Sequence, residues 1–316
     1  MFLTRMLSLA MSCAALCIAP AADVPRGFAL RPSDVAAFVG GSDVASAQFT
    51  GHLETLLAVK FPGTRFRNLG WEGDTVFAQP RDFGFPPLTE RLKRYGITVL
   101  FLEFGRAEAL NGRATVPKFF SAYDKLVNDC AQQTPRIVLV APPPFETGSG
   151  LLPDLSRRNP TLAAHANAIR TLARQRSLPL IDLFAEFGGA AHEEPRLTDN
   201  GLQMTPRGHA LIASGVARQL GFVEIAARAG GVSENGAWSN KEFETLRQLV
   251  LEKNGLWFNF SRPQNWAFLG GDRVSQPSSR DHRNPSVRWF PAEMEKYVPL
   301  IRAKEIEIEQ AAAPLR

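Results

Sequence analysis

Cysteine is scarce in this chain, and its scarcity excludes a scaffold held together by disulfides. Only 3 cysteines occur among the 316 residues, and Cys13 and Cys17 fall in a hydrophobic leader. Disulfide-stabilised folds place many more cysteines in much shorter chains. If the leader is removed, Cys130 remains alone and no internal disulfide can form, so stability must come from an ordinary hydrophobic core.

Long apolar runs and long basic runs are also missing. The hydrophobic stretch Met6–Ile18 is shorter than the roughly 20 residues needed to span a bilayer. It precedes an Ala-x-Ala signal at residues 19–21, so we interpret residues 1–21 as a secretory signal peptide and expect an exported, periplasmic or extracellular protein without stable membrane insertion after cleavage. The formal net charge of +5 is scattered, with no run of five Lys or Arg, and this argues against a nucleic-acid partner.

The chain does contain a regular alternation of apolar and amphipathic segments. Five apolar segments predict strands: Val35–Gly40, Thr64–Leu69, Ile97–Phe104, Arg136–Ala141 and Leu178–Phe184. Helical spacing follows over residues 53–61, 88–95, 117–133, 159–176 and 206–220. Apolar strands that alternate with helices are typical of a parallel sheet covered on both faces. The sequence therefore predicts a flavodoxin-like three-layer α/β/α sandwich with a five-stranded parallel sheet over residues 32–222.

The composition changes after Phe222. Residues 223–316 contain a glycine-rich stretch, helical spacing over 240–254 and 291–309, and an aromatic cluster between Trp257 and Phe268. Aliphatic residues are too few for an independent core, so we expect a helical C-terminal extension packed on the main domain. The aromatic cluster has two interpretations, packing against the main domain or stacking on sugar rings.

Glycines and polar residues follow the predicted strands, at the edge where a parallel sheet places its ligand site. Ser42 follows the first strand, where a serine can be a nucleophile or only a helix cap. Gly73 follows the second strand, where it can bring a backbone N–H to an oxyanion or only form a tight turn. Asp199, Asn200 and Gln203 precede the last helix of the predicted domain.

In order and placement these segments resemble the SGNH (GDSL-like) hydrolase family over roughly residues 34–221. The resemblance rests on RNLGWEGDTVF after the second strand and on LTDNGLQMTPRGH before the last helix, and it is strongest to a divergent exported branch. The segments RPQNWAFLGGDR and RWFPAEMEKY also look like that branch. The resemblance implies the SGNH hydrolase fold and an ester hydrolase or deacylase, acting on a small-molecule or carbohydrate ester without a cofactor or metal.

The resemblance assigns roles to residues one position at a time. Ser42 falls on the nucleophile, with Gly41 in place of the usual Asp before it. Gly73 falls on the oxyanion-hole glycine. Ala107 stands where the family has an Asn that donates to the oxyanion.

The last block departs furthest from the family pattern. Asn200 falls on the family's Asp, with Asp199 adjacent, and Gln203 falls on the general-base His. A Gln amide cannot accept the serine proton at neutral pH. Two functions from different classes therefore remain: a hydrolase that uses Ser42 with an unusual base, and a catalytically silent relative that binds a glycan or a protein partner.

Three histidines are candidates for the missing base. His192 is the first candidate because it shares a loop with Asp199, and His209 and His52 are the others. Asp199 itself is a poor base for a serine, since its reference pKa is about 3.9.

A hard-metal site is a further alternative. Its carboxylates would come from the predicted strand ends: Asp43, Asp74, Glu108 and Asp199. No tight ligand spacing supports it, and solvated loop acids are the simpler interpretation.

Overall fold

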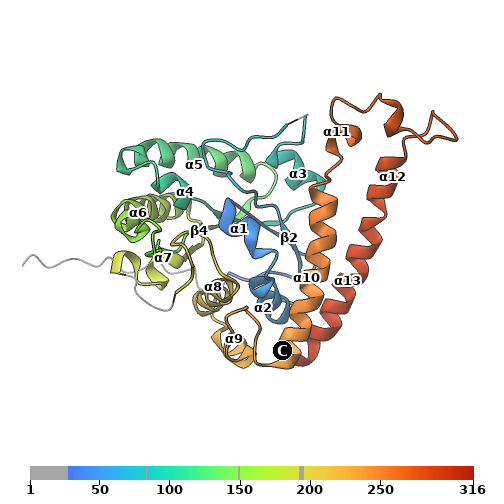
Figure 1. Cartoon of the computed structure of the whole chain (residues 1–316). Helices are drawn as coiled ribbons and strands as arrows, with labels where there is room; N and C mark the ends of the chain where they lie inside the picture. The colour runs from blue at the N-terminus through green and yellow to red at the C-terminus, as the bar shows by residue number, and fades with distance from the viewer. Residues whose placement is uncertain (1–27, 83, 149, 192–195) are drawn as a thin grey trace, which may run out of the picture.

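One parallel sheet organises the part of the chain that the structure describes. The structure is a computed structural model, and it describes residues 28–316 except 83, 149 and 192–195, so the expected signal peptide and His192 lie outside the described residues. The sheet has the order β2-β1-β3-β4-β5, with every pair parallel. Its strands are β1 (Val35–Gly40), β2 (Arg65–Asn68), β3 (Val99–Glu103), β4 (Arg136–Ala141) and β5 (Leu180–Asp182). The predicted sheet and its flavodoxin-like order are confirmed (Figure 1).

Helices connect the strands and then extend beyond the sheet. Those within or directly after the sheet region are α1 (Ser42–Ala47), α2 (His52–Lys60), α3 (Leu88–Arg94), α4 (Arg106–Ala109), α5 (Val116–Ala131), α6 (Asn159–Arg176), α7 (Leu183–Glu186), α8 (Pro206–Gln219) and α9 (Val223–Ala229). The C-terminal helices are α10 (Lys241–Ser261), α11 (Trp266–Leu269), α12 (Trp289–Glu295) and α13 (Tyr297–Ala312).

Alternate residues of each strand face two separate cores. In β3, Val99 and Phe101 belong to a core shared with α2, α8, α9 and the first half of α10. Leu100 and Leu102 belong to the opposite core, shared with α3, α5 and α6. Because helices cover both faces, the strands are apolar on both sides, as the three-layer prediction requires.

Two glycines bring α1 against the carboxyl edge of the sheet. A Cβ on Gly40 would lie 2.4 Å from the Glu103 carbonyl oxygen and 2.6 Å from Val44 Cγ2. A Cβ on Gly70, in the loop after β2, would lie 2.7 Å from Val44 Cγ1. Any larger residue at either position would push α1 off the strand ends, so these glycines set where the helix begins.

The C-terminal helices pack on the β2 edge of the sheet. Figure 1 shows α10 and α13 side by side, with α11 and α12 projecting beyond the main domain. The Lys253 ammonium of α10 lies 2.7 Å from Glu54 Oε1 of α2 and donates to the Phe66 carbonyl at 3.2 Å. Trp257 is 3% exposed and its indole N–H donates to the Asn68 carbonyl at 2.7 Å, so this member of the aromatic cluster packs against the main domain.

The extension differs from the sequence-based expectation in three places. The helix predicted over 240–254 continues to Ser261, because the aromatic residues beyond 254 pack on the main domain: Trp257 on Asn68, Phe258 on Phe49 and Phe260 on Tyr95. The helix predicted over 291–309 is two helices that meet at Lys296. Pro299 lacks the N–H needed to continue α12, and it is tolerated in the first turn of α13. The sequence did not predict α9.

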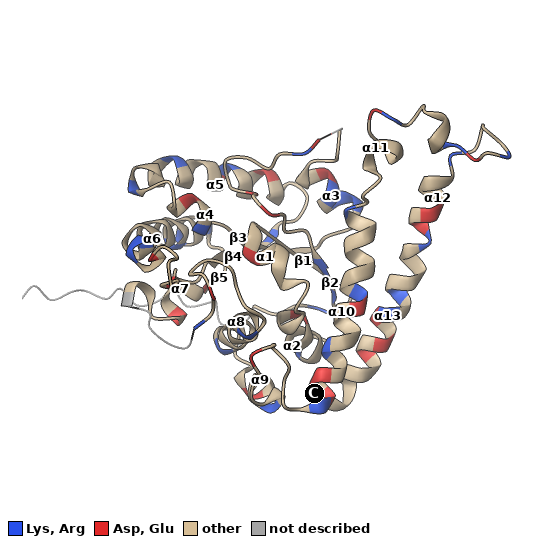
Figure 2. Cartoon of the chain, in the orientation of Figure 1, with Lys and Arg blue, Asp and Glu red and all other residues tan. Residues whose placement is uncertain are grey.

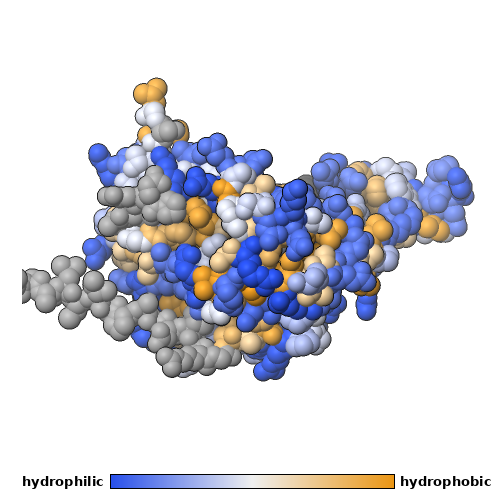
Figure 3. All heavy atoms as spheres, turned by 90° about the horizontal axis from the view of Figure 1, so that it is seen from below, coloured by the Kyte–Doolittle hydropathy of each residue, from blue (hydrophilic) through white to orange (hydrophobic). Residues whose placement is uncertain are grey.

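Charges of both signs are spread over the described surface. In Figure 2, Lys and Arg alternate with Asp and Glu along α13, where the Lys304 ammonium lies 2.7 Å from Glu252 of α10 and from Glu307. Seen from below, apolar side chains form small separate patches among hydrophilic ones (Figure 3). No helix in the described part of the chain has both the length and the apolar character needed to cross a bilayer.

Candidate functional site

A large pocket lies at the carboxyl edge of the sheet, and we call it the main pocket. Its volume is about 590 Å³, and its walls come from the loops after β1, β2, β3 and β4 and from the loop before α8. The residues that line it are Gly41, Ser42, Asp43, Val44, Ser46, Phe49, Glu72, Asp74, Glu103, Phe104, Gly105, Arg106, Ala107, Glu108, Leu110, Pro142, Leu202, Gln203 and Met204. Loops distant in sequence meet here because all parallel strands end at the same edge.

Ser42 is the first residue of α1 and faces the main pocket. The N-cap position belongs to Gly41, and no side chain caps this helix. The Ser42 hydroxyl makes no hydrogen bond with any residue that the structure describes, so the helix-cap interpretation is wrong. A Cβ on Gly41 would lie 2.9 Å from the Asp74 carbonyl oxygen, which fixes the serine close to the second loop.

The loop after β2 makes a tight turn beside Ser42. Gly73 has a φ of +81°, and the Asp74 amide donates to the Trp71 carbonyl at 3.1 Å. The neighbours of Gly73 on both sides line the main pocket, whereas Gly73 does not. The positive φ explains the glycine, and its role as an oxyanion donor stays a prediction.

Asp74 and Glu108, two of the carboxylates considered for a metal site, are already engaged. Both oxygens of Asp74 accept hydrogen bonds from Arg81 at 2.8 Å. The Glu108 carboxylate accepts from the Gly105 and Val76 amides, at 2.8 Å each. Glu108 therefore holds the loop after β3 against the loop after β2.

Arg106 joins several walls of the main pocket. Its Nη1 atom donates to both Asp43 oxygens at 3.0 Å and to the Leu202 carbonyl at 2.8 Å. The guanidinium also lies 5.2 Å from the ring centre of Phe145. One buried side chain thus ties α1 to the loop before α8. Ala107, directly after it, lacks the side-chain amide that the family's Asn offers to the pocket.

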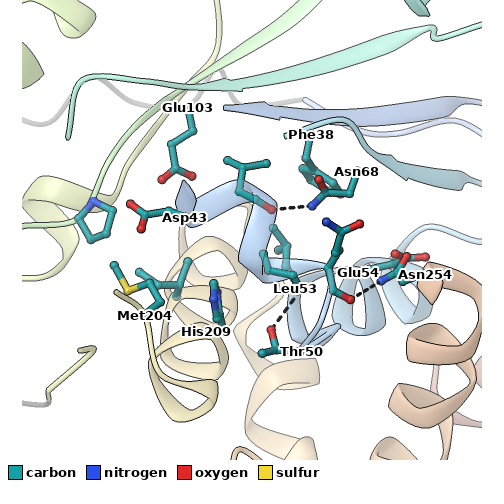
Figure 4. Close-up of a pocket in the computed structure, with 15 residues that line it drawn as sticks. Phe38, Asp43, Thr50, Leu53, Glu54, Asn68, Glu103, Met204, His209 and Asn254 are labelled. Atoms are coloured by element: carbon teal, nitrogen blue, oxygen red, sulfur yellow. Dashed lines mark hydrogen bonds between the residues drawn. The ribbon is translucent and has the colours of Figure 1, made fainter. Parts of the chain in front are cut away.

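Glu103 ends β3 and presents its carboxyl group to Asp43, as Figure 4 shows. The Glu103 carboxyl group makes no hydrogen bond with a described residue. Burial and the adjacent Asp43 carboxylate raise the pKa of Glu103 to about 8, and the charge of Arg106 only partly opposes them. Glu103 is therefore mostly protonated at neutral pH and can donate a hydrogen bond. An acid that closes an otherwise apolar strand is the sequence signal for such a residue.

Gln203 takes the place of the family's histidine in the loop before α8. It is exposed and lines the main pocket. Asn200 holds Gln203 with two hydrogen bonds. Asn200 Oδ1 accepts from the backbone N–H of Gln203 at 2.7 Å, and Asn200 Nδ2 donates to the side-chain Oε1 of Gln203 at 3.1 Å. Asp199 is exposed and does not line the main pocket. Of these three residues only Gln203 lines the pocket, and its side-chain amide is not a base; Asn200 holds Gln203 without lining the pocket itself.

His209 lies behind the main pocket, against α1. Its Nε2 atom is 3.0 Å from the Ser46 hydroxyl, one turn of α1 beyond Ser42. It lines a smaller cavity of about 70 Å³, shown in Figure 4. Burial, with a contribution from the charge of Arg106, lowers the pKa of His209 to about 4. Ser46 sits near the end of α1, where the helix dipole disfavours an oxyanion, so this pair is a packing contact.

None of the four histidines that the structure describes lines the main pocket. His52 lies 2.7 Å from the Gly236 carbonyl through its Nε2 atom, and burial lowers its pKa to about 4. His165 contacts residues of its own helix and of the loop before α5, and His282 is exposed in the C-terminal extension. His52 and His209 are thus bonded away from Ser42, and His192 lies outside the described residues.

The hard-metal alternative finds no support in the described ranges. There, no group of three or more His, Cys, Asp or Glu side chains could hold a metal ion. Asp43 and Asp74 are paired with Arg106 and Arg81, and Glu108 binds backbone amides.

The structure resembles several solved enzymes at low sequence identity. A gut microbial diltiazem-metabolizing enzyme is 12% identical, with a TM-score of 0.58 over 91% of this chain and 95% of that one. A catalytic mutant of an acetylxylan esterase from Geobacillus stearothermophilus is 15% identical, with a TM-score of 0.48 over 61% and 96%. A lipase/acylhydrolase from Enterococcus faecalis is 19% identical, with a TM-score of 0.46 over 62% and 96%.

The sequence itself gives the family. A search of the curated proteins finds no match. The sequence model of the GDSL-like Lipase/Acylhydrolase family matches residues 36–211, which is more than half of the chain and runs from β1 into α8. With the parallel sheet and the pocket at its carboxyl edge, this match confirms the resemblance: the chain belongs to the GDSL-like Lipase/Acylhydrolase family.

Proposed function

We propose that this member of a hydrolase family binds an acylated carbohydrate in the main pocket and does not hydrolyse it by the family's serine–histidine chemistry. One observation carries the proposal: Ser42 faces a large pocket, and no described histidine lines that pocket with it. Gln203 occupies the position expected for the base.

The expected loss of rate is large. Removal of the histidine from a serine hydrolase lowers kcat by roughly 10⁶, and a missing oxyanion donor lowers it by about 10²–10³. In this chain Gln203 stands in place of the histidine, and Ala107 stands in place of the Asn that donates to the oxyanion. No described histidine lines the pocket to take the proton of the free Ser42 hydroxyl.

The pocket walls support a neutral polar ligand such as a sugar. Phe49 is 56% exposed and lines the pocket, so its ring is available to stack on a sugar face. Glu103 can donate a hydrogen bond to a hydroxyl, and Asp43 and Glu72 can accept one. A few directional polar groups beside an apolar surface are typical of small-molecule sites.

Turnover of p-nitrophenyl acetate by the wild-type chain and by Ser42→Ala tests the catalytic half of the proposal. Equal rates, and no labelling of the wild type by a fluorophosphonate, are expected. A much faster wild type would instead establish a serine hydrolase.

Gln203→His tests whether only the base is missing. We expect a gain of about 10²–10⁴ in p-nitrophenyl acetate turnover, the usual contribution of a general base. The gain should disappear in Gln203→His combined with Ser42→Ala, which keeps the new imidazole and removes the nucleophile. Adding Ala107→Asn should raise the rate further.

Calorimetry with acetylated xylo-oligosaccharides tests the binding half. Phe49→Ala should weaken binding about tenfold, because the apolar surface that a sugar buries on an aromatic ring contributes on the order of 1 kcal/mol. Phe77→Ala is the matched control, since Phe77 is also exposed but does not line the pocket. Equal losses in both variants would contradict a sugar stacked on Phe49.

An active ester hydrolase is the second candidate, favoured by the free Ser42 hydroxyl at the pocket. It requires a base from residues that the structure does not describe, and His192 is the candidate. If wild-type turnover depends on Ser42, His192→Ala should abolish it, whereas His282→Ala should not.

We also propose that the chain is exported, on the basis of residues 1–21. A fusion of this segment to a reporter active only outside the cytoplasm should be active, and the mature chain should begin after residue 21.

A further inference from the structure

A second cavity lies between α3 and the C-terminal helices, and we call it the arginine pocket. Its volume is about 180 Å³. Arg91 and Tyr95 line it from α3 and the residue after it, Phe85 from the preceding loop, and Phe260 and Trp266 from the extension. It shares no lining residue with the main pocket.

Arg91 is a buried cation without an acidic partner. Its side chain is 3% exposed, its Nε atom is buried without a hydrogen bond, and it forms no ion pair with any described residue. The neighbouring Arg81 and Arg262 differ, because each forms an ion pair, with Asp74 and Glu72 respectively. A buried charge is unfavourable unless it is paired. Because Arg91 lines the arginine pocket, an anion bound there could pair with its guanidinium.

Arg91 stays charged under physiological conditions. Burial and the nearby Arg81 lower the pKa of Arg91 to about 10, and the groups of Tyr95 and Asp74 partly oppose this change. A guanidinium with that pKa is protonated at pH 7. Its charge therefore persists at the wall of a largely apolar cavity.

Aromatic rings form a large part of the other walls, and the exposed Arg94 adds a second cation to the lining. The Phe85 and Trp266 rings meet edge to face with centres 5.0 Å apart, and the Arg91 guanidinium lies 5.6 Å from the Phe85 ring centre. The volume is close to the roughly 150 Å³ of an apolar cavity that holds benzene. Glu295 also lines the pocket, but it is exposed, so solvent weakens its repulsion of an anion.

We propose that the arginine pocket binds a small aromatic carboxylate, whose anionic group pairs with Arg91 and whose ring packs against the Phe85 and Trp266 rings where they line the cavity. A planar carboxylate matches the fork of donors on a guanidinium. The ring replaces water on the aromatic walls. The site is separate from the main pocket and does not depend on what that pocket binds or hydrolyses.

Titration of the full chain with benzoate, and with benzamide as its neutral counterpart, tests the proposal. We expect saturable benzoate binding in calorimetry, at least tenfold tighter than benzamide binding, with quenching of tryptophan fluorescence. Absence of saturable benzoate binding up to millimolar concentrations would overturn the proposal, as would equal affinity for benzamide.

Variants locate the site. Arg91→Met should reduce benzoate affinity at least tenfold, whereas Lys93→Gln should leave it unchanged, because Lys93 lies exposed on the same helix and does not line the pocket. Leu269→Trp, which fills the cavity without altering its charge, should also abolish binding and serves if Arg91→Met fails to fold. Unchanged affinity in a folded Arg91→Met or Leu269→Trp variant would overturn the assignment.

Discussion

At the scale of single residues, the candidate site is controlled by how charges are paired. Asp43 is held by Arg106, whereas Glu103 beside it has no basic partner of its own and keeps its proton to about pH 8. A carboxyl group whose pKa is raised by folding lowers stability as pH rises, because the unfolded chain releases the proton first.

Glu103→Gln should reveal this effect. The pKa of Glu103 is raised from its ordinary value of 4.5 to about 8, so the wild type should lose stability progressively between about pH 4.5 and 8. The Gln side chain of the variant does not titrate, so this position no longer makes stability depend on pH. The variant should therefore be more stable than the wild type at pH 8 and equally stable near pH 4.5. Urea unfolding across this range measures the difference. A difference that does not change with pH would contradict the raised pKa.

Sequence reasoning located part of this site. Ser42 and Gln203 line the pocket as the sequence predicts, because strand ends can be predicted from apolar periodicity and parallel strands end together. Glu103 and Arg91 were missed, since what distinguishes them is a missing partner, and partners come from segments distant in the sequence. The Ser42 cap interpretation failed because the chain turns into α1 one residue earlier, at Gly41.

At the scale of elements, strands were easier to predict than the helices of the extension. β1 and β4 have the predicted bounds because both faces of each strand are buried, which makes the apolar run continuous. α10 was predicted too short, because its second half owes its stability to β2 and α13 rather than to its own pattern. Gly255, which lies inside that helix, also lowers its intrinsic helix propensity.

Gly255→Ala should stabilise α10. A Cβ at this position meets no atom within 4 Å, and its φ is not positive. Replacing glycine by alanine inside a helix is expected to raise the free energy of unfolding by about 0.5–1 kcal/mol. Chemical denaturation measures this. Gly215→Ala in α8 is the control that should destabilise, because its Cβ would press on Phe187 at 3.2 Å.

Lys253→Met should strongly weaken the attachment of α10. Lys253 is 1% exposed, and its loss leaves Glu54 as a buried charge without its closest partner. Breaking one side of a buried pair lowers stability by about 3–5 kcal/mol. Lys253→Met combined with Glu54→Gln should recover much of that loss. If the double variant is as unstable as the sum of the single variants, the two residues are not coupled.

At the scale of the whole molecule, the C-terminal extension and the sheet share their cores. Phe243 and Val250 of α10 belong to the same core as Phe101 of the sheet, and Trp257 belongs to the opposite one. The predicted packing of an aliphatic-poor extension on the main domain has this physical basis, although the sequence could not show which sheet edge it covers.

Unfolding of the full chain should therefore be a single transition. Far-ultraviolet circular dichroism, which follows the sheet and helices, should give the same midpoint as fluorescence of the tryptophans, most of which lie in the extension. Coincident curves are the mark of one cooperative unit. An early fluorescence transition would mean that the extension unfolds alone.

The five separate loops that build the main pocket have a practical consequence. A ligand in the main pocket contacts loops that are distant from one another in the sequence. It binds only when all of these loops are folded. Such a ligand stabilises the native state by about 2.7 kcal/mol at a free concentration about 100 times its Kd. The Tm of this protein should therefore rise when a ligand binds the main pocket. A panel of sugar esters can be ranked by the increase in Tm that each one causes, with no turnover required.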